Sequence, residues 1–301
     1  TKGWLPISDD DVTDVPAKGN ENGIFGYGVS SGYHSLTNLV SDAGVVATDT
    51  TGVGTARANL GACQYGGDKG IFGYGQSYTA ITNLVSNSGV VATDTSGVGT
   101  ARAYISAAEY GTDKGIFAFG YTAADVNVTY ANRVTNVGVV GTDVATTSAT
   151  ARSNMASCGY GGDKAIFGFG ASGAGQHGQT NLVSNVGVIA ADVSAVGSAR
   201  SQCAATEYDY DKGIFGYGIG YTAITNKVSN SGVIATDVTG VGTARGYLAA
   251  CTYGGDKGIF GFGYTGSDHS VTNLINNSGV VASDVTGVGT ARRAPAACSY
   301  N

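Results

Sequence analysis

The sequence has few charged residues and very little proline, methionine or tryptophan. Charged residues make up 13% of its 301 residues, and it contains three prolines, one methionine and one tryptophan. Fifty residues are glycine. A glycine inside a helix costs about 1 kcal/mol relative to alanine, so this composition excludes a long helical or coiled-coil protein. Short strands joined by tight turns are the expected structure.

The chain also lacks the patterns of membrane-inserted and nucleic-acid-binding proteins. No apolar run approaches the roughly 20 residues that a helix needs to cross a bilayer, so we expect no membrane insertion. The formal net charge is −6, and the lysines and arginines do not cluster. Nucleic-acid binding rests on clustered basic side chains that neutralise phosphates, so we expect no nucleic acid as a partner.

Enzyme signatures are missing as well. No nucleophile elbow, H-E-x-x-H zinc motif, phosphate-binding loop or nucleotide-binding glycine pattern occurs in the strand-to-helix setting that such motifs require. The many G-x-G pairs lie in segments that read as strands. We therefore assign no catalytic residue, no metal and no cofactor from the sequence.

What the sequence does contain is a repeat of 45 to 50 residues. Each copy reads close to G-I-F-G-Y-G, then T-N-L-V-S-N-S-G-V-V-A-T-D, then G-V-G-T-A-R. The six copies begin near Gly23, Gly70, Gly115, Ala165, Gly213 and Gly258. Periods of this length mark propellers and solenoids, in which each unit buries its faces only against its neighbours.

One repeat, from Arg57 to Arg102, predicts four strands. They are residues 58–65 (ANLGACQY), 69–75 (KGIFGYG), 82–92 (TNLVSNSGVVA) and an edge strand at 98–102, with turns at 66–68 and 93–97. Four strands in about 47 residues is the content of a propeller blade. The glycines that alternate with Phe72 and Tyr74 would let the aromatic rings of the next blade approach closely.

The two ends of the chain predict how the repeats close. The chain enters at the second strand of a repeat and ends with a lone first strand, Arg293 to Tyr300. The predicted fold is therefore an all-β, six-bladed β-propeller of four-stranded antiparallel blades over residues 22–301, with the ring closed by the C-terminal strand. Residues 1–21 form a leader, with Trp4 and an acidic stretch, that we expect to attach to another subunit.

The five cysteines are predicted to be buried free thiols. Cys63, Cys158, Cys251 and Cys298 lie six residues after a repeat arginine, and Cys203 lies three after its own. An odd number argues against a complete disulfide framework. Equivalent positions in neighbouring sheets are about 10 Å apart, beyond the roughly 7 Å that a disulfide bridges. No C-x-x-C or Cys/His spacing indicates zinc.

Two residue types recur at fixed places and are expected to be structural. The repeat arginines should donate hydrogen bonds between blades, to carbonyls or to the turn aspartates. The aspartates each follow Thr, Ala or Ser and should cap that turn. The arginines are Arg57, Arg102, Arg152, Arg200, Arg245 and Arg292, and the aspartates are Asp49, Asp94, Asp143, Asp192, Asp237 and Asp284.

The copies differ most between the second and third predicted strands. These stretches are residues 29–36, 76–81, 121–130, 171–179, 219–224 and 264–271. Because a repeat scaffold can change its loops without changing its core, we expect binding to reside there. The candidate ligand-binding residues are Tyr33, His34, Tyr78, Tyr121, Asp125, Tyr130, His177, Gln179, Tyr221, Tyr264, Asp268 and His269.

Tyrosine beside Gly, Ser, Asp and Gln suits stacking on sugar rings or gripping a protein epitope. The alternative is that these tyrosines cap a sheet face and that the three histidines are exposed polar loop residues. The histidines fall in repeats one, four and six, on one face but not side by side, so no shared metal site is expected.

The order of arginine, small-residue strand, Y-G-G-D-K turn and I-F-G-Y-G strand resembles the Kelch-type propeller repeat from Gly23 onward. The chain departs from that pattern because the tryptophan expected near the fourth strand is absent, and its only tryptophan is Trp4. The wording K-G-I-F-G-Y-G with T-N-L-V-S-N-S-G-V-V-A-T-D-T-S-G-V-G-T-A-R resembles repeats of predicted bacteriophage tail or fibre proteins. That resemblance implies a virion-surface or extracellular location, other virion subunits as partners and a homo-oligomer.

We therefore expect a non-enzymatic binding or structural module that recognises a host-surface glycan or protein through variable loops on one propeller face. Two alternatives stay open. One is a propeller-type carbohydrate-active enzyme, a glycoside hydrolase or lyase, with Asp125, Asp268, Glu109 and Glu207 meeting across the channel. The other is a cellular protein-interaction scaffold.

Overall fold

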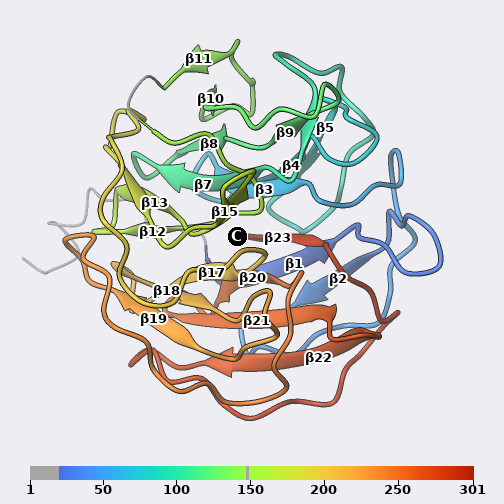
Figure 1. Cartoon of the computed structure of the whole chain (residues 1–301). Coiled ribbons are helices and arrows are strands. Elements are labelled where there is room, and N and C mark those ends of the chain that lie inside the picture. Colours follow the sequence, from blue (N-terminus) through green and yellow to red (C-terminus); the bar gives the residue numbers. More distant parts are fainter. Residues whose placement is uncertain (1–19, 147–148) are drawn as a thin grey trace, which may run out of the picture.

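The protein consists of small antiparallel sheets, six of which correspond to the six repeats (Figure 1). The computed structural model describes residues 20–146 and 149–301, and these form strands and loops but no helix. The prediction of an all-β fold is confirmed. The predicted leader, residues 1–21, lies outside the described residues apart from Asn20 and Glu21.

Each sheet has a first strand near the centre, a second strand antiparallel to it and a third strand further out. The first strands are β3 (Gly61–Tyr65), β7 (Ser106–Tyr110), β12 (Ala156–Tyr160), β17 (Ala204–Tyr208), β20 (Ala249–Tyr253) and β23 (Ala296–Tyr300). The second strands are β1 (Asn22–Gly26), β4 (Lys69–Gly73), β8 (Lys114–Ala118), β13 (Lys164–Gly168), β18 (Lys212–Gly216) and β21 (Lys257–Tyr264). The third strands are β2 (Thr37–Val40), β5 (Thr82–Val85), β10 (Tyr130–Val134), β16 (Thr180–Val183), β19 (Thr225–Val228) and β22 (Asp268–Ile275).

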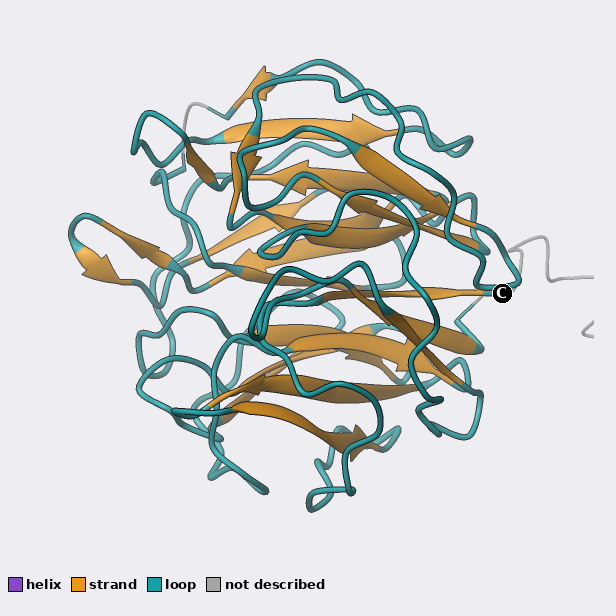
Figure 2. Cartoon of the chain, turned by 90° about the vertical axis from the view of Figure 1, so that its right-hand side faces the viewer, coloured by secondary structure: helices purple, strands orange, loops and turns teal. Residues whose placement is uncertain are grey.

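Five short strands complete the set. They are β6 (Arg102–Ala103), β9 (Tyr121–Thr122), β11 (Val144–Ala145), β14 (Ala171–Ser172) and β15 (Gly175–Gln176). Strand β6 pairs with β9, and β14 pairs with β15 in a separate hairpin. That hairpin projects from one end of the body in the side view (Figure 2).

The prediction of four strands in every sheet is wrong. Among the described residues only the sheet of the third repeat has four, because β11 pairs with β10, and the other repeat sheets have three. In the type repeat the third strand ends at Val85, and the chain turns back so that Val91 bridges to Val85 and Thr95 to Thr82. Gly89 in this turn has a φ of 75°, a backbone conformation that favours glycine, so the S-N-S-G sequence turns the chain instead of extending the strand.

The predicted edge strand at 98–102 is a connection instead. Of these five residues only Arg102 belongs to a strand, as the first residue of β6. The segment carries the chain from the outer part of one sheet to the first strand of the next.

The last strand of the chain completes the sheet that the first strand begins. Strand β23 pairs antiparallel with β1, with Cys298 opposite Ile24 and Tyr300 opposite Asn22. This predicted pairing is confirmed. The first strands also contact one another in a cycle: β3 contacts β7, and the contacts continue through β12, β17, β20 and β23 back to β3 (Figure 1).

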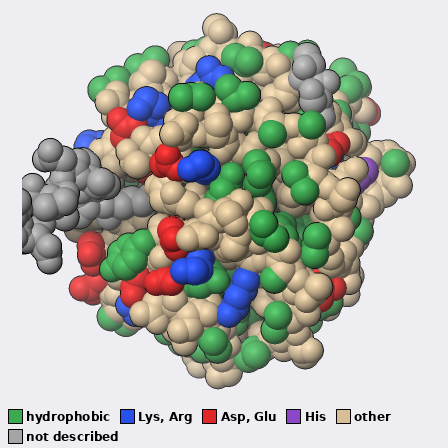
Figure 3. All heavy atoms as spheres, turned by 90° about the vertical axis from the view of Figure 1, so that its left-hand side faces the viewer, with side chains coloured by type: hydrophobic (Ala, Val, Ile, Leu, Met, Phe, Trp, Pro, Cys, Tyr) green, Lys and Arg blue, Asp and Glu red, His purple; other side chains and the backbone are tan. Residues whose placement is uncertain are grey.

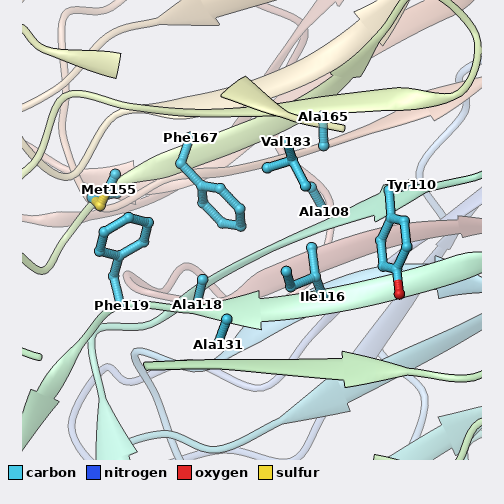
Figure 4. Close-up of a cluster of buried hydrophobic side chains, with 10 residues drawn as sticks. All are labelled: Ala108, Tyr110, Ile116, Ala118, Phe119, Ala131, Met155, Ala165, Phe167 and Val183. Carbon is cyan, nitrogen blue, oxygen red and sulfur yellow. The ribbon is translucent and has the colours of Figure 1, made fainter. Parts of the chain in front are cut away.

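The hydrophobic core lies between neighbouring sheets and is repeated around the molecule. Figure 4 shows one such layer, in which Phe119 from one sheet meets Phe167 from the next, with ring centroids 5.5 Å apart. Glycine makes the approach possible elsewhere: a Cβ built on Gly73 would lie 2.7 Å from Cζ of Phe117 in the following sheet. The predicted role of the strand glycines is therefore confirmed at this position.

The repeat arginines lie between neighbouring sheets and are completely buried or nearly so. Arg57 donates from Nε to the carbonyl of Tyr74 at 2.8 Å and from Nη2 to Oδ1 of Asn83 at 2.7 Å, both in the second sheet. Its guanidinium carbon lies 4.4 Å from the ring centroid of Tyr27 in the first sheet. One side chain thus joins two sheets by hydrogen bonds and a cation–π contact.

The repeat aspartates secure the connection between sheets rather than only their own turn. The Asp94 carboxylate accepts hydrogen bonds from the backbone N–H of Thr55 at 3.0 Å and from its hydroxyl at 2.6 Å, and Asn83 donates to it at 2.9 Å. Thr55 lies 39 residues earlier, in the segment that enters the second sheet. The prediction that this carboxylate accepts a backbone N–H group is therefore confirmed, but the N–H group belongs to Thr55 and not to the turn that contains Asp94.

All five cysteines are buried thiols outside any disulfide, as the sequence predicted. Burial raises the pKa of the Cys251 thiol to about 12, because the thiolate would lose its hydration there. These thiols act as small apolar packing groups: Sγ of Cys63 lies against Gly115 of the next sheet.

Candidate functional site

The residues that differ among the repeats gather at one end of the sheets. Each first strand runs towards a tight turn, such as residues 66–68, and each second strand returns. The loop after the second strand therefore adjoins the residues just before the first: Gln76 donates its N–H to the carbonyl of Ala58 at 2.7 Å, and Asn59 Nδ2 donates to Oε1 of Gln76 at 2.8 Å. We call this end the loop face and the other end the turn face.

Six equivalent residues form a closed ring of backbone hydrogen bonds on the loop face. We call them the mouth ring, and each lies two residues after a repeat arginine: Asn59, Tyr104, Asn154, Gln202, Tyr247 and Ala294. The N–H of each donates to the carbonyl of the member before it, and the N–H of Asn59 donates to the carbonyl of Ala294, at 2.8–3.1 Å.

All six members adopt the left-handed conformation, with φ between 51° and 57°. Asparagine tolerates this region well, but a tyrosine there is uncommon, so the surrounding hydrogen bonds must hold it. With Leu60, Met155 and their equivalents, the ring lines a cavity of about 80 Å³. The sequence analysis missed these residues. The signal that could have found them is a position that differs among the copies although it lies only two residues after an arginine present in every copy.

Two tyrosine clusters flank the mouth ring. In the first, Tyr104 and Tyr121 lie edge to face with centroids 6.4 Å apart. In the second, Tyr264 lies 6.3 Å from both Tyr247 and Tyr221. The candidate tyrosines Tyr121, Tyr221 and Tyr264 are thus brought together with mouth-ring members in two groups. Aromatic pairs of this geometry are rigid contact surfaces.

The three histidines each bond within their own loop. Nε2 of His34 lies 2.6 Å from the Ser30 hydroxyl, and Nε2 of His177 lies 2.7 Å from the Ser172 hydroxyl. Nε2 of His269 lies 2.9 Å from the Thr265 hydroxyl. They are half-buried, so the reading as exposed polar residues is wrong; instead they tie the loop ends together.

The remaining candidates differ in exposure. Tyr33 is 45% exposed and Asp125 is exposed at its loop tip, so both are available to a ligand. Gln179 is half-buried, with Oε1 3.1 Å from Nδ1 of His177. Tyr130 is half-buried at the start of β10, where its carbonyl accepts the N–H of Phe119. Gln179 and Tyr130 are thus positioned to shape their loops more than to contact a ligand.

The four carboxylates considered for a hydrolase do not share one site. Glu109 and Glu207 lie on first strands and line a central cavity of about 60 Å³ together with four cysteines. Asp125 lies on a loop, and Asp268 is the first residue of β22. The cavity has room for a few water molecules but not for a sugar chain, because a water fills about 30 Å³ of liquid. Gly159 leaves space for Glu207: a Cβ there would lie 1.4 Å from Oε1.

Within residues 20–146 and 149–301, no three side chains of His, Cys, Asp or Glu are grouped so as to hold a metal ion. The same residues include no helix that is long and apolar enough to cross a membrane.

The turn face is more uniform and more charged. The Asp–Lys pairs of the tight turns, such as Asp163 and Lys164 at 2.6 Å, lie there, partly exposed. The turns that follow the third strands lie beside the tight turns of the turn face: Nδ2 of Asn87, for example, donates to Oδ2 of Asp68 at 3.3 Å. Each of these turns carries a valine that is more than half exposed, Val45, Val90, Val139, Val188, Val233 and Val280. On the side of the molecule seen in Figure 3, apolar side chains form separate groups among polar ones.

Compared with models of protein families and with curated proteins, the chain matches none of them. The class of protein is therefore defined by its fold and its face: an all-β repeat protein whose sheets carry variable, tyrosine-rich loops around a central mouth.

Proposed function

We propose that the protein is a six-bladed β-propeller that acts as a non-enzymatic binding module through its loop face. Three series of contacts run from sheet to sheet around the molecule and return to their start, which supports the propeller. They are the contacts between first strands, the hydrogen bonds of the mouth ring, and the hydrogen bonds of the repeat aspartates, where Asp49 of the first sheet binds Thr290 near the end of the chain. In a closed ring the first and last repeats cover each other, so neither leaves an exposed sheet edge, and the loops are held on a rigid platform.

One observation carries the binding function: the residues that differ among the repeats gather on the loop face, whereas the repeat arginines and the asparagines that they bind are buried between sheets. Arg57 and Asn83 are fully buried, while Tyr33 and Tyr221 on the loop face are 45% and 42% exposed. A rigid aromatic surface beside polar loops is suited to a host-surface glycan or protein. In this proposal the protein resides on a virion surface or outside the cell, as the likeness of its repeats to those of predicted bacteriophage tail or fibre proteins implies.

Attachment to other virion subunits is part of the same proposal. The leader that would mediate it lies outside the described residues, so the support comes from its sequence, with Trp4 and the acidic stretch. Self-association would add binding strength by presenting several loop faces at once.

The test compares two faces of one molecule. Labelled protein is applied to a glycan array and to a panel of intact bacterial cells, with Tyr33→Ala, Tyr121→Ala, Tyr221→Ala and Tyr264→Ala combined in one variant. The control is Tyr210→Ala, which removes a tyrosine that is 62% exposed at a tight turn of the turn face. We expect binding to be lost in the first variant and kept in the second.

The reverse pattern would show that the turn face binds the ligand. Release of products from polysaccharides, abolished by Asp125→Asn or Asp268→Asn, would replace the binding module by a carbohydrate-active enzyme. The cellular scaffold is distinguished by a different measurement: the protein would be absent from purified virus particles.

A further inference from the structure

The loop face contains the same four residues twice, at a constant separation of 143 positions. Tyr78, Tyr104, Tyr121 and Asp125 make up the first cluster, and Tyr221, Tyr247, Tyr264 and Asp268 make up the second. The local sequences agree as well, Y-T-A-A-D from Tyr121 and Y-T-G-S-D from Tyr264. Three repeats separate the clusters, so in a ring of six they lie on opposite sides of the mouth.

The second cluster already holds a guanidinium group that belongs to the chain itself. The guanidinium carbon of Arg293 lies 4.8 Å from the ring centroid of Tyr264. Its Nη1 donates to Oδ1 of Asp268 at 2.9 Å. The pair is partly exposed, with 33% of the arginine side chain and 19% of the aspartate side chain accessible to solvent. The planar guanidinium group of Arg293 thus stacks on the ring of Tyr264 and donates a hydrogen bond to the carboxylate of Asp268.

The first cluster has no such group. Arg293 directly follows the repeat arginine Arg292, and the residue that follows Arg152, its counterpart beside the first cluster, is Ser153. Asp125 is exposed, four residues after Tyr121 on the same loop. Among the described residues, no arginine or lysine forms a salt bridge with Asp125 or lies over the ring of Tyr121.

The members of the first cluster are close enough to influence one another. Desolvation raises the pKa of Tyr78, and the charges of Tyr104 and Asp125 raise it further. Desolvation and the adjacent Asp125 raise the pKa of Tyr121. The geometric core of the cluster is the Tyr104–Tyr121 pair, with ring centroids 6.4 Å apart, and the exposed Asp125 follows on the loop of Tyr121, in a protein whose net charge is −6. Such surroundings attract cations.

We propose that the first cluster binds the guanidinium group of an arginine side chain on a protein ligand, in the manner in which the second cluster holds Arg293. This inference rests on the proposed binding function and names its ligand chemistry. Arginine fits better than lysine because a planar guanidinium can stack on tyrosine while it donates to a carboxylate. A neutral glycan offers no cation, so the inference favours a protein ligand.

The test uses the full chain and a matched pair of peptides. Acetyl-Gly-Arg-Gly-amide and its citrulline counterpart differ in charge but little in shape. We follow tyrosine signals by NMR during each titration. The arginine peptide should bind at one site, with a dissociation constant on the order of millimolar, and the citrulline peptide should produce no saturable shift. Asp125→Asn, at an exposed position, should weaken binding at least about fivefold, the loss expected for a charge-assisted hydrogen bond.

Two reciprocal variants test the equivalence of the clusters. Arg293→Ser should open the second cluster and raise the stoichiometry from one peptide to two. Ser153→Arg should fill the first cluster with an arginine of the chain itself and abolish peptide binding. Because Ser153 is buried, the folding of this variant is checked by circular dichroism. Asp125→Asn tests the same site at an exposed position, without the risk of misfolding.

Equal binding of both peptides, or unchanged binding in Asp125→Asn, would overturn the inference. Its failure is distinguishable from failure of the proposed function. If the loop-face variant loses array or cell binding but the arginine peptide does not bind, only the inference falls. If the peptide binds as described while the loop-face variant keeps full array and cell binding, the proposed function falls and the guanidinium site stands.

Discussion

Asp49 binds Thr290, a residue 241 positions away along the chain. Its carboxylate accepts the backbone N–H of Thr290 at 2.9 Å and the hydroxyl at 2.6 Å. The same pair of bonds occurs between Asp94 and Thr55 inside the chain. The junction between the ends of the chain is therefore built like any other junction between sheets.

Removing the last strand should destabilise the whole protein. Deletion of residues 296–301 removes β23, leaves β1 and β2 as a two-stranded sheet and exposes the face of β20 that β23 covers. We expect loss of soluble folded protein, measured by size-exclusion chromatography and circular dichroism. Deletion of Asn301 alone is the control, because it leaves β23 intact. A folded, monomeric 296–301 deletion would show that closure does not matter for stability.

Replacing the asparagine beside a repeat arginine should be costly. Asn83→Ala leaves Nη2 of the buried Arg57 without its acceptor, so the free energy of unfolding should fall by about 2–3 kcal/mol. Urea denaturation measures the change. Asn87→Ala, in an exposed turn, should alter stability by less than about 0.5 kcal/mol. Similar values for both would contradict the structural role of Asn83.

Stability should fall steeply in acid. Desolvation of the Asp94 carboxylate opposes its ionisation, but hydrogen bonds from Thr55 and Asn83 and the charge of Arg57 outweigh it and lower its pKa. A carboxyl whose pKa is lower in the folded state stabilises the fold above the unfolded value of about 3.9, and this contribution is lost as the pH falls through the folded pKa.

The five equivalent aspartates share this lowered pKa. Thermal unfolding midpoints between pH 6 and pH 2 should therefore drop below about pH 4. Asp94→Asn should be less stable at pH 6 and less sensitive to acid. A variant with the full acid dependence would argue that other groups cause it.

Enlarging a strand glycine should strain the packing between sheets. Gly73→Ala places a methyl group against Phe117 and should cost about 1–3 kcal/mol. Phe117→Leu in the same chain should recover part of that cost, giving a coupling energy in a double-mutant cycle. The third sheet has Ala118 at this position and a wider ring spacing, 5.5 Å against 5.2 Å for Tyr74 and Phe117. Additive effects of the two changes would show that the residues do not compete for space.

The cysteines should be unreactive in the native protein. Burial raises the pKa of four of the five thiols, those of Cys63, Cys203, Cys251 and Cys298, so their reactive thiolate is scarce at neutral pH. An aromatic disulfide reagent should label fewer than one of the five thiols natively and all five in guanidinium chloride. Rapid native labelling would mean that the first strands open easily.

Much of the fold followed from the repeat, because strand pairing is local and glycine–aromatic alternation has a clear packing meaning. The pairing of β23 with β1 was predictable from where the copies begin and end. The outer edge of each sheet was not predictable, because a stretch such as TNLVSNSGVVA has strand-forming residues on both sides of a turn. The bridge between Val85 and Val91 and the φ of 75° at Gly89 show that the chain reverses there.

The sequence predicted which face of the protein carries the variable loops, but it did not predict which side chains contact one another there. The variable loops do gather at one end, yet the tyrosine clusters depend on Tyr104 and Tyr247, which lie outside those loops in sequence. The histidines looked like surface residues because a hydroxyl four or five positions earlier carries no strong sequence signal. Long-range neighbours of this kind emerge only when the sheets are placed around a common centre.

The mouth ring has a practical consequence for altering this protein. Its six hydrogen bonds use only main-chain atoms, so the width of the opening does not depend on which side chains surround it. The chain already places asparagine, tyrosine, glutamine and alanine at equivalent points of one circle. New ligand preferences are therefore accessible through single-residue exchanges at that circle, without redesign of any loop, provided that each newcomer accepts a positive φ.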